Sequence, residues 1–210
     1  EYVSGEASIL RIPNFEDFSG IVMASGTYPA QELKDQIIEL IKKKCSCPIV
    51  EIADTSTSFP SISLENNLTT GTLTEHLISV HNYKHICYLG SKTERYFSDK
   101  RAQAFRDVMI QHGYTIGDHD MFDTTITEEG VREAFDYFCE GSDKLPEAVV
   151  CYNDKMALLF TVIAIRKGYR IPEDIALVGC DALPEGQNMT APLTTVSFPT
   201  YQLGAESVKQ

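Results

Sequence analysis

The sequence predicts an α/β protein built around parallel β-sheets. Short apolar runs alternate with segments of helical periodicity through nearly all of its 210 residues, a pattern typical of β-α-β units. Most of the runs are rich in β-branched residues and almost continuously apolar, as strands covered on both faces must be. The composition, 43% hydrophobic and 23% charged, is that of a globular chain that folds.

The expected strands follow from these apolar runs, and the expected helices follow from the segments of helical periodicity. Strands are predicted over residues 20–24, 48–52, 85–89, 148–152, 175–180 and 193–198. Helices are predicted where apolar residues recur at helical spacing, over residues 33–41, 102–109, 131–138 and 157–165. Gly113 and Gly168 each follow a helical segment and should close it in the left-handed conformation. The polar stretch 65–72 is the better candidate for a crossing between two lobes.

The charge and the cysteine content of the chain limit which partners it is expected to bind. Lys and Arg number 18 against 30 Asp and Glu, a formal net charge of −12, so this segment should repel nucleic acid and not bind it directly. No apolar run reaches the roughly 18 residues of a membrane helix, and the start shows no signal-peptide pattern. The six scattered cysteines are typical of reduced core thiols, which leads us to expect a cytoplasmic protein that does not contact membranes. Cys45 and Cys47 form a C-x-C pair without a second pair, so no metal or cofactor is predicted.

Polar residues that directly follow the predicted strands are the first candidates for a binding site. Ligands of open parallel sheets gather outside the carboxyl ends of the strands. The residues in these positions are Ser25, Asp54, Ser91, Asn153, Asp154 and Asp181.

A purely structural alternative applies to some of these residues and not to others. Asn153 and Asp154 precede a predicted helix, so either can simply be its N-cap. Asp181 precedes no strong helix, and a binding role is therefore favoured there. Arg101 lies in the first turn of a helix starting near Ser98, where a cation opposes the helix dipole, which favours a ligand or a carboxylate partner.

Three segments together resemble one known family in order and spacing. Residues 148–157 (AVVCYNDKMA), 168–181 (GYRIPEDIALVGCD) and 192–196 (PLTTV) resemble the effector-binding domain of the LacI/GalR family. Weaker agreement extends through residues 98–101, 75–78 and 19–23, so the resemblance covers nearly the whole chain.

The resemblance implies a type I periplasmic-binding-protein-like architecture: two Rossmann-like lobes with parallel sheets, of which the N-terminal lobe is incomplete. Residues 1–68 and 197–210 would form that lobe, and residues 69–196 the other. Arg101, Asn153 and Asp181 would hydrogen-bond an effector, a sugar first and a nucleoside second, with Ser25 and Asp54 as further candidates. Phe198 would either stack on a sugar face or belong to the core.

The implied function is that of a small-molecule sensor and not of an enzyme, since neither a nucleophile elbow nor a phosphate loop is visible. Ligand-induced lobe closure would control DNA binding through a helix-turn-helix that is missing here, and we expect a fragment of a homodimer with contacts in residues 154–167 and 183–189. Two alternatives stay open. The turn 80–83 has one residue more than the common family form, like sensors attached to diguanylate cyclases or kinases, and a solute-binding transport receptor would share the fold.

Overall fold

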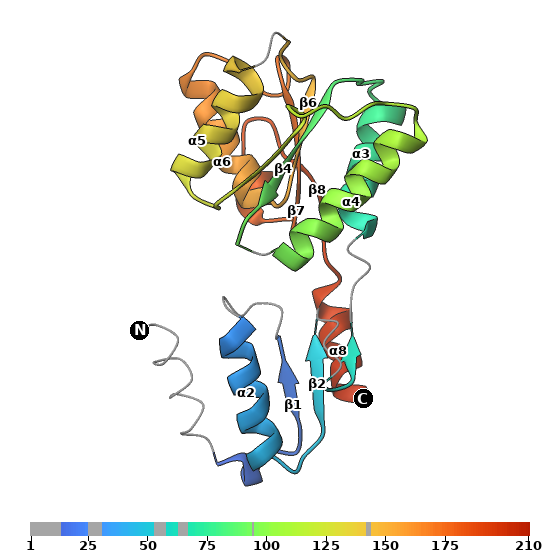
Figure 1. The fold of residues 1–210 in the computed structure, drawn as a ribbon, viewed down its shortest axis with the longest axis vertical. Helices are drawn as coiled ribbons and strands as arrows, with labels where there is room; N and C mark the ends of the chain where they lie inside the picture. The colour runs from blue at the N-terminus through green and yellow to red at the C-terminus, as the bar shows by residue number, and fades with distance from the viewer. Residues whose placement is uncertain (1–13, 25–30, 53–57, 63–66, 94, 142–143) are drawn as a thin grey trace. The chain divides into compact units, whose positions relative to one another are not determined.

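The computed structural model describes residues 14–24, 31–52, 58–62, 67–93, 95–141 and 144–210. The chain separates into two compact units, a smaller one of residues 1–64 with 199–210 and a larger one of residues 65–198 (Figure 1). The divisions therefore fall at 64/65 and 198/199, whereas the sequence analysis placed the lobe boundaries at 68/69 and 196/197.

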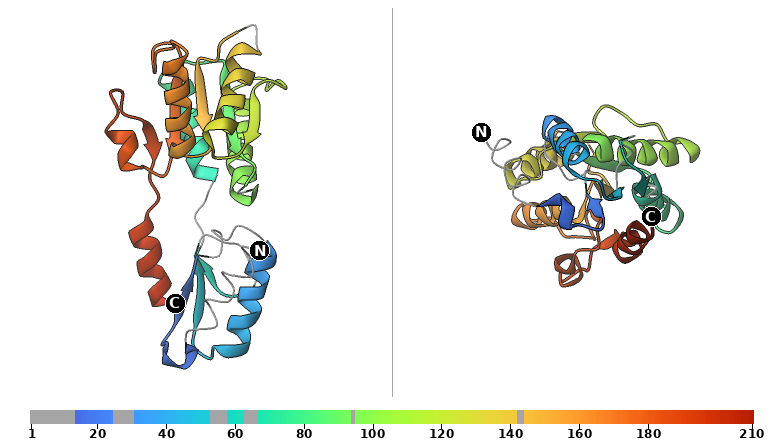
Figure 2. Two further views of the ribbon diagram at one scale, coloured as in Figure 1. Left: turned by 90° about the vertical axis from the view of Figure 1, so that its left-hand side faces the viewer. Right: turned by 90° about the horizontal axis from the view of Figure 1, so that it is seen from below.

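The smaller unit contains a short parallel sheet. Its strands are β1 (Ile21–Met23), β2 (Ile49–Ile52) and β3 (Ser61–Ile62), in the order β1-β2-β3. A 3-10 turn, Phe15–Asp17, and α2 (Gln31–Lys44) pack on it through a core of Phe15, Met23, Leu33, Ile37, Ile38 and Ile41. The last helix, α8 (Thr200–Lys209), lies beside β2 and β3 (Figure 2).

The larger unit is built on a five-stranded sheet in the order β5-β4-β6-β7-β8, with every neighbouring pair parallel. The strands are β4 (Ile86–Ser91), β5 (Met121–Thr124), β6 (Ala148–Cys151), β7 (Ala176–Cys180) and β8 (Thr194–Val196). The parallel α/β class predicted from the sequence is confirmed. The sequence analysis missed β5, a four-residue strand that ends in Asp123 and Thr124 and so shows no continuous apolar run.

Helices cover both faces of this sheet. On one side lie α3 (Asn67–Ser79) and α4 (Arg95–Gln111), and on the other α5 (Glu128–Phe135), the π-helical turn Asp136–Glu140 and α6 (Asp154–Arg166); α7 (Pro184–Gln187) is a single short turn (Figure 1). In β4, Cys87 and Leu89 face the core beneath α5 and α6, while Ile86 and Tyr88 face the core beneath α3 and α4. Because side chains alternate along a strand, a sheet covered on both faces needs apolar residues at every position.

The polar stretch 65–72 was not predicted to be helical. Helix α3 begins at Asn67, so most of this polar stretch is helical. Two threonines of α3, Thr70 and Thr74, are buried, and their hydroxyls find backbone partners: Thr70 donates to the Arg101 carbonyl at 2.6 Å, and Thr74 donates to the Thr70 carbonyl at 2.7 Å. A satisfied hydroxyl costs little to bury, so polarity was a poor guide here.

The predicted helix ends are confirmed. Gly113 closes α4 with φ of 78° and Gly168 closes α6 with φ of 90°. The amide of the following tyrosine bonds back in both cases, Tyr114 to the Met109 carbonyl and Tyr169 to the Ala164 carbonyl. Asn82 also adopts a left-handed conformation, with φ of 56°.

All six cysteines are free thiols, and Cys87, Cys151 and Cys180 are buried. Burial raises the pKa of the Cys180 thiol to about 11 and raises the pKa of the Cys87 and Cys151 thiols as well. In the described part of the chain, every helix is too short or too polar to cross a bilayer.

Candidate functional site

The candidate site lies at the carboxyl edge of the larger sheet, where β4, β6 and β7 end side by side. Tyr152 and Asn153 follow β6, and Asp181 follows β7. Arg101 comes from α4, the helix that follows β4. This helix begins at Arg95 and not near Ser98, so Arg101 lies in its second turn, and the helix-dipole effect expected from the sequence does not apply to it. The strand order thus brings together polar groups that are far apart in the sequence, as expected at this edge of a parallel sheet.

Arg101 is held as a buried cation between two aromatic rings. Only 5% of the residue is exposed. One terminal nitrogen donates to the Tyr152 carbonyl at 2.6 Å. The guanidinium carbon lies 4.5 Å from the centre of the Tyr152 ring and 5.2 Å from that of Phe198, within cation-π range of both. Its buried Nε has no hydrogen-bond partner among the described residues.

Asp181 faces this guanidinium. The second terminal nitrogen of Arg101 lies 3.9 Å from Asp181 Oδ1, and the side chains are 6% and 34% exposed respectively. Charge-assisted N–H···O bonds measure about 2.7–2.9 Å, so the two atoms form an ion pair without a direct hydrogen bond. A hydroxyl group or a water molecule placed beside both could accept from the arginine and donate to the carboxylate.

The turn that contains Asp181 has a strained backbone, and its amide groups are all hydrogen-bonded. Asp181 has φ of 113° and Ala182 has φ of 52°, conformations that cost non-glycine residues of order 1–3 kcal/mol each. Three consecutive amides satisfy their hydrogen bonds: Asp181 donates to the Val196 carbonyl, Ala182 to Thr195 Oγ1 and Leu183 to Asp154 Oδ2, at 2.9, 3.2 and 2.8 Å. These bonds fix the direction of the Asp181 side chain.

Asp154 is the anchor of this turn. It is fully buried, and besides the Leu183 amide it accepts a 2.6 Å hydrogen bond from the Thr195 hydroxyl. Burial raises the pKa of the Asp154 carboxyl, and the bonds from Thr195 and from the turn amides oppose that rise. Gly179 leaves room for the carboxylate, because a Cβ there would lie 2.3 Å from Asp154 Oδ1. Asp154 is therefore a positioning residue for Asp181.

The other predicted site residues fall into three groups. Asn153 is the N-cap of α6, its side-chain oxygen accepting from the Met156 amide at 3.0 Å, so only its NH2 group would serve a ligand. Phe198 is half-buried, packs on the core and contacts Arg101. Ser25 and Asp54 lie outside the described residues.

Sequence reasoning missed Tyr152 and Thr195, and it left Asp154 open as either a binding residue or an N-cap. Tyr152 supplies both a carbonyl and a ring to Arg101, while Thr195 links β8 to Asp154. Their positions in the sequence could have indicated them, since Tyr152 ends a predicted strand and Thr195 lies within one. Their partners depend on strand order, which the sequence alone does not give.

Fold and site together define a class, a ligand-binding α/β domain with its polar groups at the carboxyl ends of parallel strands. The chain belongs to the periplasmic binding protein-like domain family, whose profile matches residues 74–210. More particularly, it is an effector-binding domain of the LacI/GalR type, which confirms the family predicted from the sequence.

The chain is 25% identical over 181 residues to the HTH-type transcriptional repressor PurR of Photobacterium profundum, a match that covers 85% of this chain and 53% of the relative. It thus spans about half the length of the curated relatives that it matches.

Two solved structures show the same fold. A sugar-binding transcriptional regulator of the LacI family from Escherichia coli, complexed with phosphate, is 20% identical with a TM-score of 0.79, over 98% of this chain and 72% of that one. The transcriptional regulator CelR in complex with cellobiose is 18% identical with a TM-score of 0.78, over 99% of this chain and 61% of that one.

Proposed function

We propose that this chain is the sensing domain of a LacI-type transcriptional regulator and that Arg101 and Asp181 bind a polyhydroxylated small molecule, a sugar first and a nucleoside second. The observation that carries the proposal is their juxtaposition. A buried arginine clamped by two rings lies 3.9 Å from a carboxylate on a strained turn, at the edge where parallel sheets bind ligands.

The chemistry fits a ligand with adjacent hydroxyl groups. A guanidinium offers a planar fork of donors, a carboxylate accepts from two hydroxyls, and the NH2 group of Asn153 can donate to a third. Hydrogen bonds to charged groups contribute about 1.5–3 kcal/mol each. Phe198 lies next to Arg101, where the apolar face of a sugar ring could pack.

The comparisons support the regulatory part of the proposal. The relative from Photobacterium is a transcriptional repressor, and the two structural neighbours are transcriptional regulators, one of them sugar-binding and one holding cellobiose. We infer that ligand-dependent closure of the two lobes is the signal in a cytoplasmic protein. With a formal net charge of −12, the chain itself should repel DNA, so DNA would be bound through a helix-turn-helix domain.

The turn at residues 80–83 favours a second candidate output. Its extra residue is accommodated by Asn82, whose φ is 56°, and a turn of this length resembles that of sensors linked to diguanylate cyclases or kinases. The sequence of the complete gene decides between the outputs, since a basic helix-turn-helix and a catalytic domain are easily told apart.

We also propose a homodimer with contacts along α6 and residues 183–189. Met156 and Phe160 of α6 are fully buried in the core of the unit and supply no surface to a partner. Val162 and Ile165, which are 43% and 60% exposed, are the exposed large apolar residues of this helix. Sedimentation of the full-length protein as a monomer at micromolar concentration would contradict this proposal.

A thermal-shift screen of sugars and nucleosides is the first test of binding, because a ligand at 100 times its dissociation constant adds about 2.7 kcal/mol of stability. Calorimetry on Asp181→Asn then tests the site. Asparagine tolerates a positive φ, so the turn keeps its shape while the ligand loses a charged acceptor, and affinity should fall roughly tenfold to a hundredfold.

The matched control is Glu129→Gln, which removes an exposed carboxylate in the first turn of α5 and should leave affinity unchanged. Arg101→Lys is the second variant, because lysine keeps the charge but loses the planar fork and ring stacking. Unchanged affinity in both Asp181→Asn and Arg101→Lys would show that the ligand binds elsewhere.

A further inference from the structure

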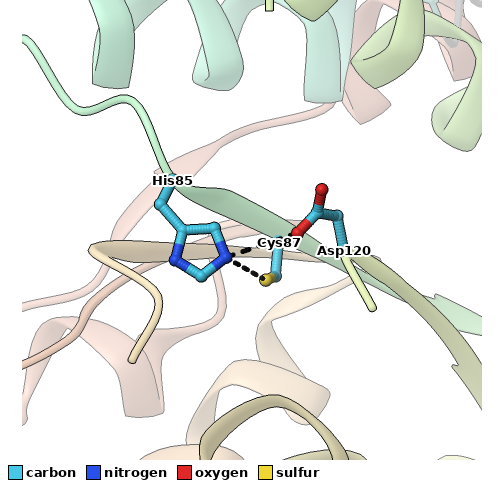
Figure 3. A group of neighbouring side chains, drawn as sticks. All are labelled: His85, Cys87 and Asp120. Atoms are coloured by element: carbon cyan, nitrogen blue, oxygen red, sulfur yellow. Dashed lines mark hydrogen bonds and ion pairs between the residues drawn. The ribbon is translucent and has the colours of Figure 1, made fainter. Parts of the chain in front are cut away.

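The opposite, amino edge of the larger sheet carries a cluster that sensing does not use. His85 directly precedes β4, Cys87 lies within β4, and Asp120 directly precedes β5. Residues 85 and 87 are two apart and share one face of the strand. Tyr88 pairs with Met121 in the parallel register, so Cys87 lies beside Asp120. Figure 3 shows the three side chains pointing toward one another.

The donor atoms of the three side chains converge. His85 Nε2 lies 3.3 Å from Asp120 Oδ1 and 4.0 Å from Cys87 Sγ, and all three donor atoms lie within 4.8 Å of one another. In a tetrahedral zinc site, the metal–ligand bond lengths place nitrogen and oxygen about 3.4 Å apart and nitrogen and sulfur about 3.6 Å apart. Shifts of about an ångström would bring the cluster to that geometry.

The histidine ring is already oriented for coordination. His85 Nδ1 lies 3.2 Å from the Leu145 carbonyl, so it can donate its proton there and leave the Nε2 lone pair pointing at the cluster. Metal-binding histidines almost always make such a bond through their second nitrogen. The backbone is also fixed, because Glu147 accepts from the amides of Lys84 and His85 at 2.7 and 2.8 Å.

A surface pocket of about 510 Å³ gives access to the cluster. Its lining includes His85 and Asp120 together with Lys84, His119 and Lys144. The side chains of His85 and Asp120 are 22% and 18% exposed, whereas Cys87 is buried behind them. An ion and a water molecule can therefore enter from this side.

The same residue types could form a nucleophilic triad, but the geometry argues against one. A triad needs the thiol and the carboxylate on opposite ring nitrogens of the histidine. Here both approach Nε2, while Nδ1 faces a backbone carbonyl. Convergence on one nitrogen fits an ion shared by three ligands.

We propose that His85, Cys87 and Asp120 bind a single divalent cation of the zinc class, with a water molecule from the pocket as the fourth ligand. The mixed nitrogen, sulfur and oxygen donor set suits zinc. The thiol proton is released to solvent when the sulfur binds the ion. Because the ligands come from the starts of two neighbouring strands, the ion would cross-link β4 to β5.

The test uses the 210-residue chain with Cys45→Ser and Cys47→Ser as the background. The Sγ atoms of Cys45 and Cys47 lie 2.9 Å apart, so this pair could bind soft metals by itself and must be removed. Cobalt(II) serves as the spectroscopic probe, since a bound thiolate gives a charge-transfer band in the near ultraviolet. We expect one cobalt ion per chain, that band, and displacement by zinc.

Three variants in this background identify the ligands. Cys87→Ser should abolish the charge-transfer band, and His85→Gln and Asp120→Asn should each weaken zinc binding by at least about a hundredfold, since even the loss of an outer-shell partner costs roughly 10–100-fold. Asp118→Asn, an exposed neighbour of the site, is the control and should bind as the background does. Circular dichroism checks that each variant is folded.

A background protein that binds no cobalt or zinc would overturn the proposal and leave His85 and Asp120 as a simple side-chain contact. A charge-transfer band that survives Cys87→Ser would also overturn it. Neither outcome bears on ligand binding by Arg101 and Asp181, which lie at the other edge of the sheet.

Discussion

The two edges of the five-stranded sheet are built differently. At the carboxyl edge, Arg101 and Asp154 are buried, and the Asp181 turn is held in a strained conformation by three backbone amides. At the amino edge, His85 and Asp120 are partly exposed, and His85 Nε2 lies 3.3 Å from Asp120 Oδ1. The carboxyl edge therefore resembles a rigid preformed site, and the amino edge a cluster that an ion could complete.

The difference follows from chain direction. In a parallel α/β sheet, each strand runs at its carboxyl end into a turn that starts a helix, so caps, turn amides and buried acceptors accumulate there. At the amino edge each helix ends and leads into the next strand, and the side chains of His85 and Asp120 stay partly exposed instead of buried. Substitutions at the carboxyl edge should consequently cost more folding free energy than those at the amino edge.

The largest effect is expected for Gly179→Ala. The new Cβ would lie 2.3 Å from Asp154 Oδ1 and 3.0 Å from the Asp154 Cα, and the backbone atom cannot move aside without shifting α6. Overpacking together with a disturbed buried carboxylate should lower the free energy of unfolding by about 3 kcal/mol. Urea denaturation measures the change.

Gly204→Ala is the control for that experiment, because nothing lies within 4 Å of a Cβ at this position in α8. Alanine is the better helix former, so this variant should be neutral or slightly stabilising. Equal stability of the Gly179→Ala and Gly204→Ala proteins would mean that the carboxyl edge is less rigid than the geometry indicates.

Thr195→Val should have the next largest effect. Valine keeps the shape, but the buried Asp154 carboxylate loses a donor and the Ala182 amide loses its acceptor. We expect a loss of about 2 kcal/mol, measured by thermal and urea unfolding. Thr194→Val, at the exposed neighbouring position of β8, supplies the comparison and should change stability by less than about 0.5 kcal/mol.

The free energy of unfolding should depend on pH differently in the natural protein and in Asp154→Asn, which cannot ionise at this position. Burial raises the pKa of Asp154 above its ordinary value of 3.8, so just above pH 3.8 the folded chain holds a proton that the unfolded chain has lost. The contribution of this group to stability is therefore full below that pH and declines as pH rises through the folded pKa. The stability of the natural protein relative to Asp154→Asn should fall over this window, in urea titrations at matched pH values. A difference that rises with pH would have the wrong sign.

The smallest effect is expected at the amino edge. With a chelator present, Asp120→Asn should cost less than about 1 kcal/mol, because partly exposed ion pairs contribute little and the amide oxygen can still accept from the Gly117 amide that Asp120 now binds at 2.6 Å. Differential scanning calorimetry without zinc measures this cost, and the same measurement with zinc gives the stability that the bound ion adds. If Asp120→Asn without metal lowered the free energy of unfolding as much as Thr195→Val does, the two edges of the sheet would not differ in rigidity.

The sequence by itself determined the α/β class, six of the strands, the helix ends at Gly113 and Gly168, and the family. Each of these features can be predicted from neighbouring residues in the sequence. Burial on both faces makes a strand continuously apolar, and a helix end in the left-handed conformation favours glycine. Asn153 and Asp181 could be singled out for the same reason, since each lies directly beyond a strand. Arg101 was singled out on a predicted helix start near Ser98, whereas the helix begins at Arg95.

Only the tertiary structure decided which of these groups meet. Asp154 and Thr195 are 41 positions apart, and Cys87 and Asp120 become neighbours through the pairing of β4 with β5, a strand that shows no continuous apolar run. Strand order arises from packing of the whole unit, and strands that are apolar on both faces lack the alternation that would fix their register. The cation stacking of Arg101 and the converging donors of His85, Cys87 and Asp120 are for that reason properties of the fold and could not be predicted from the pattern along the chain.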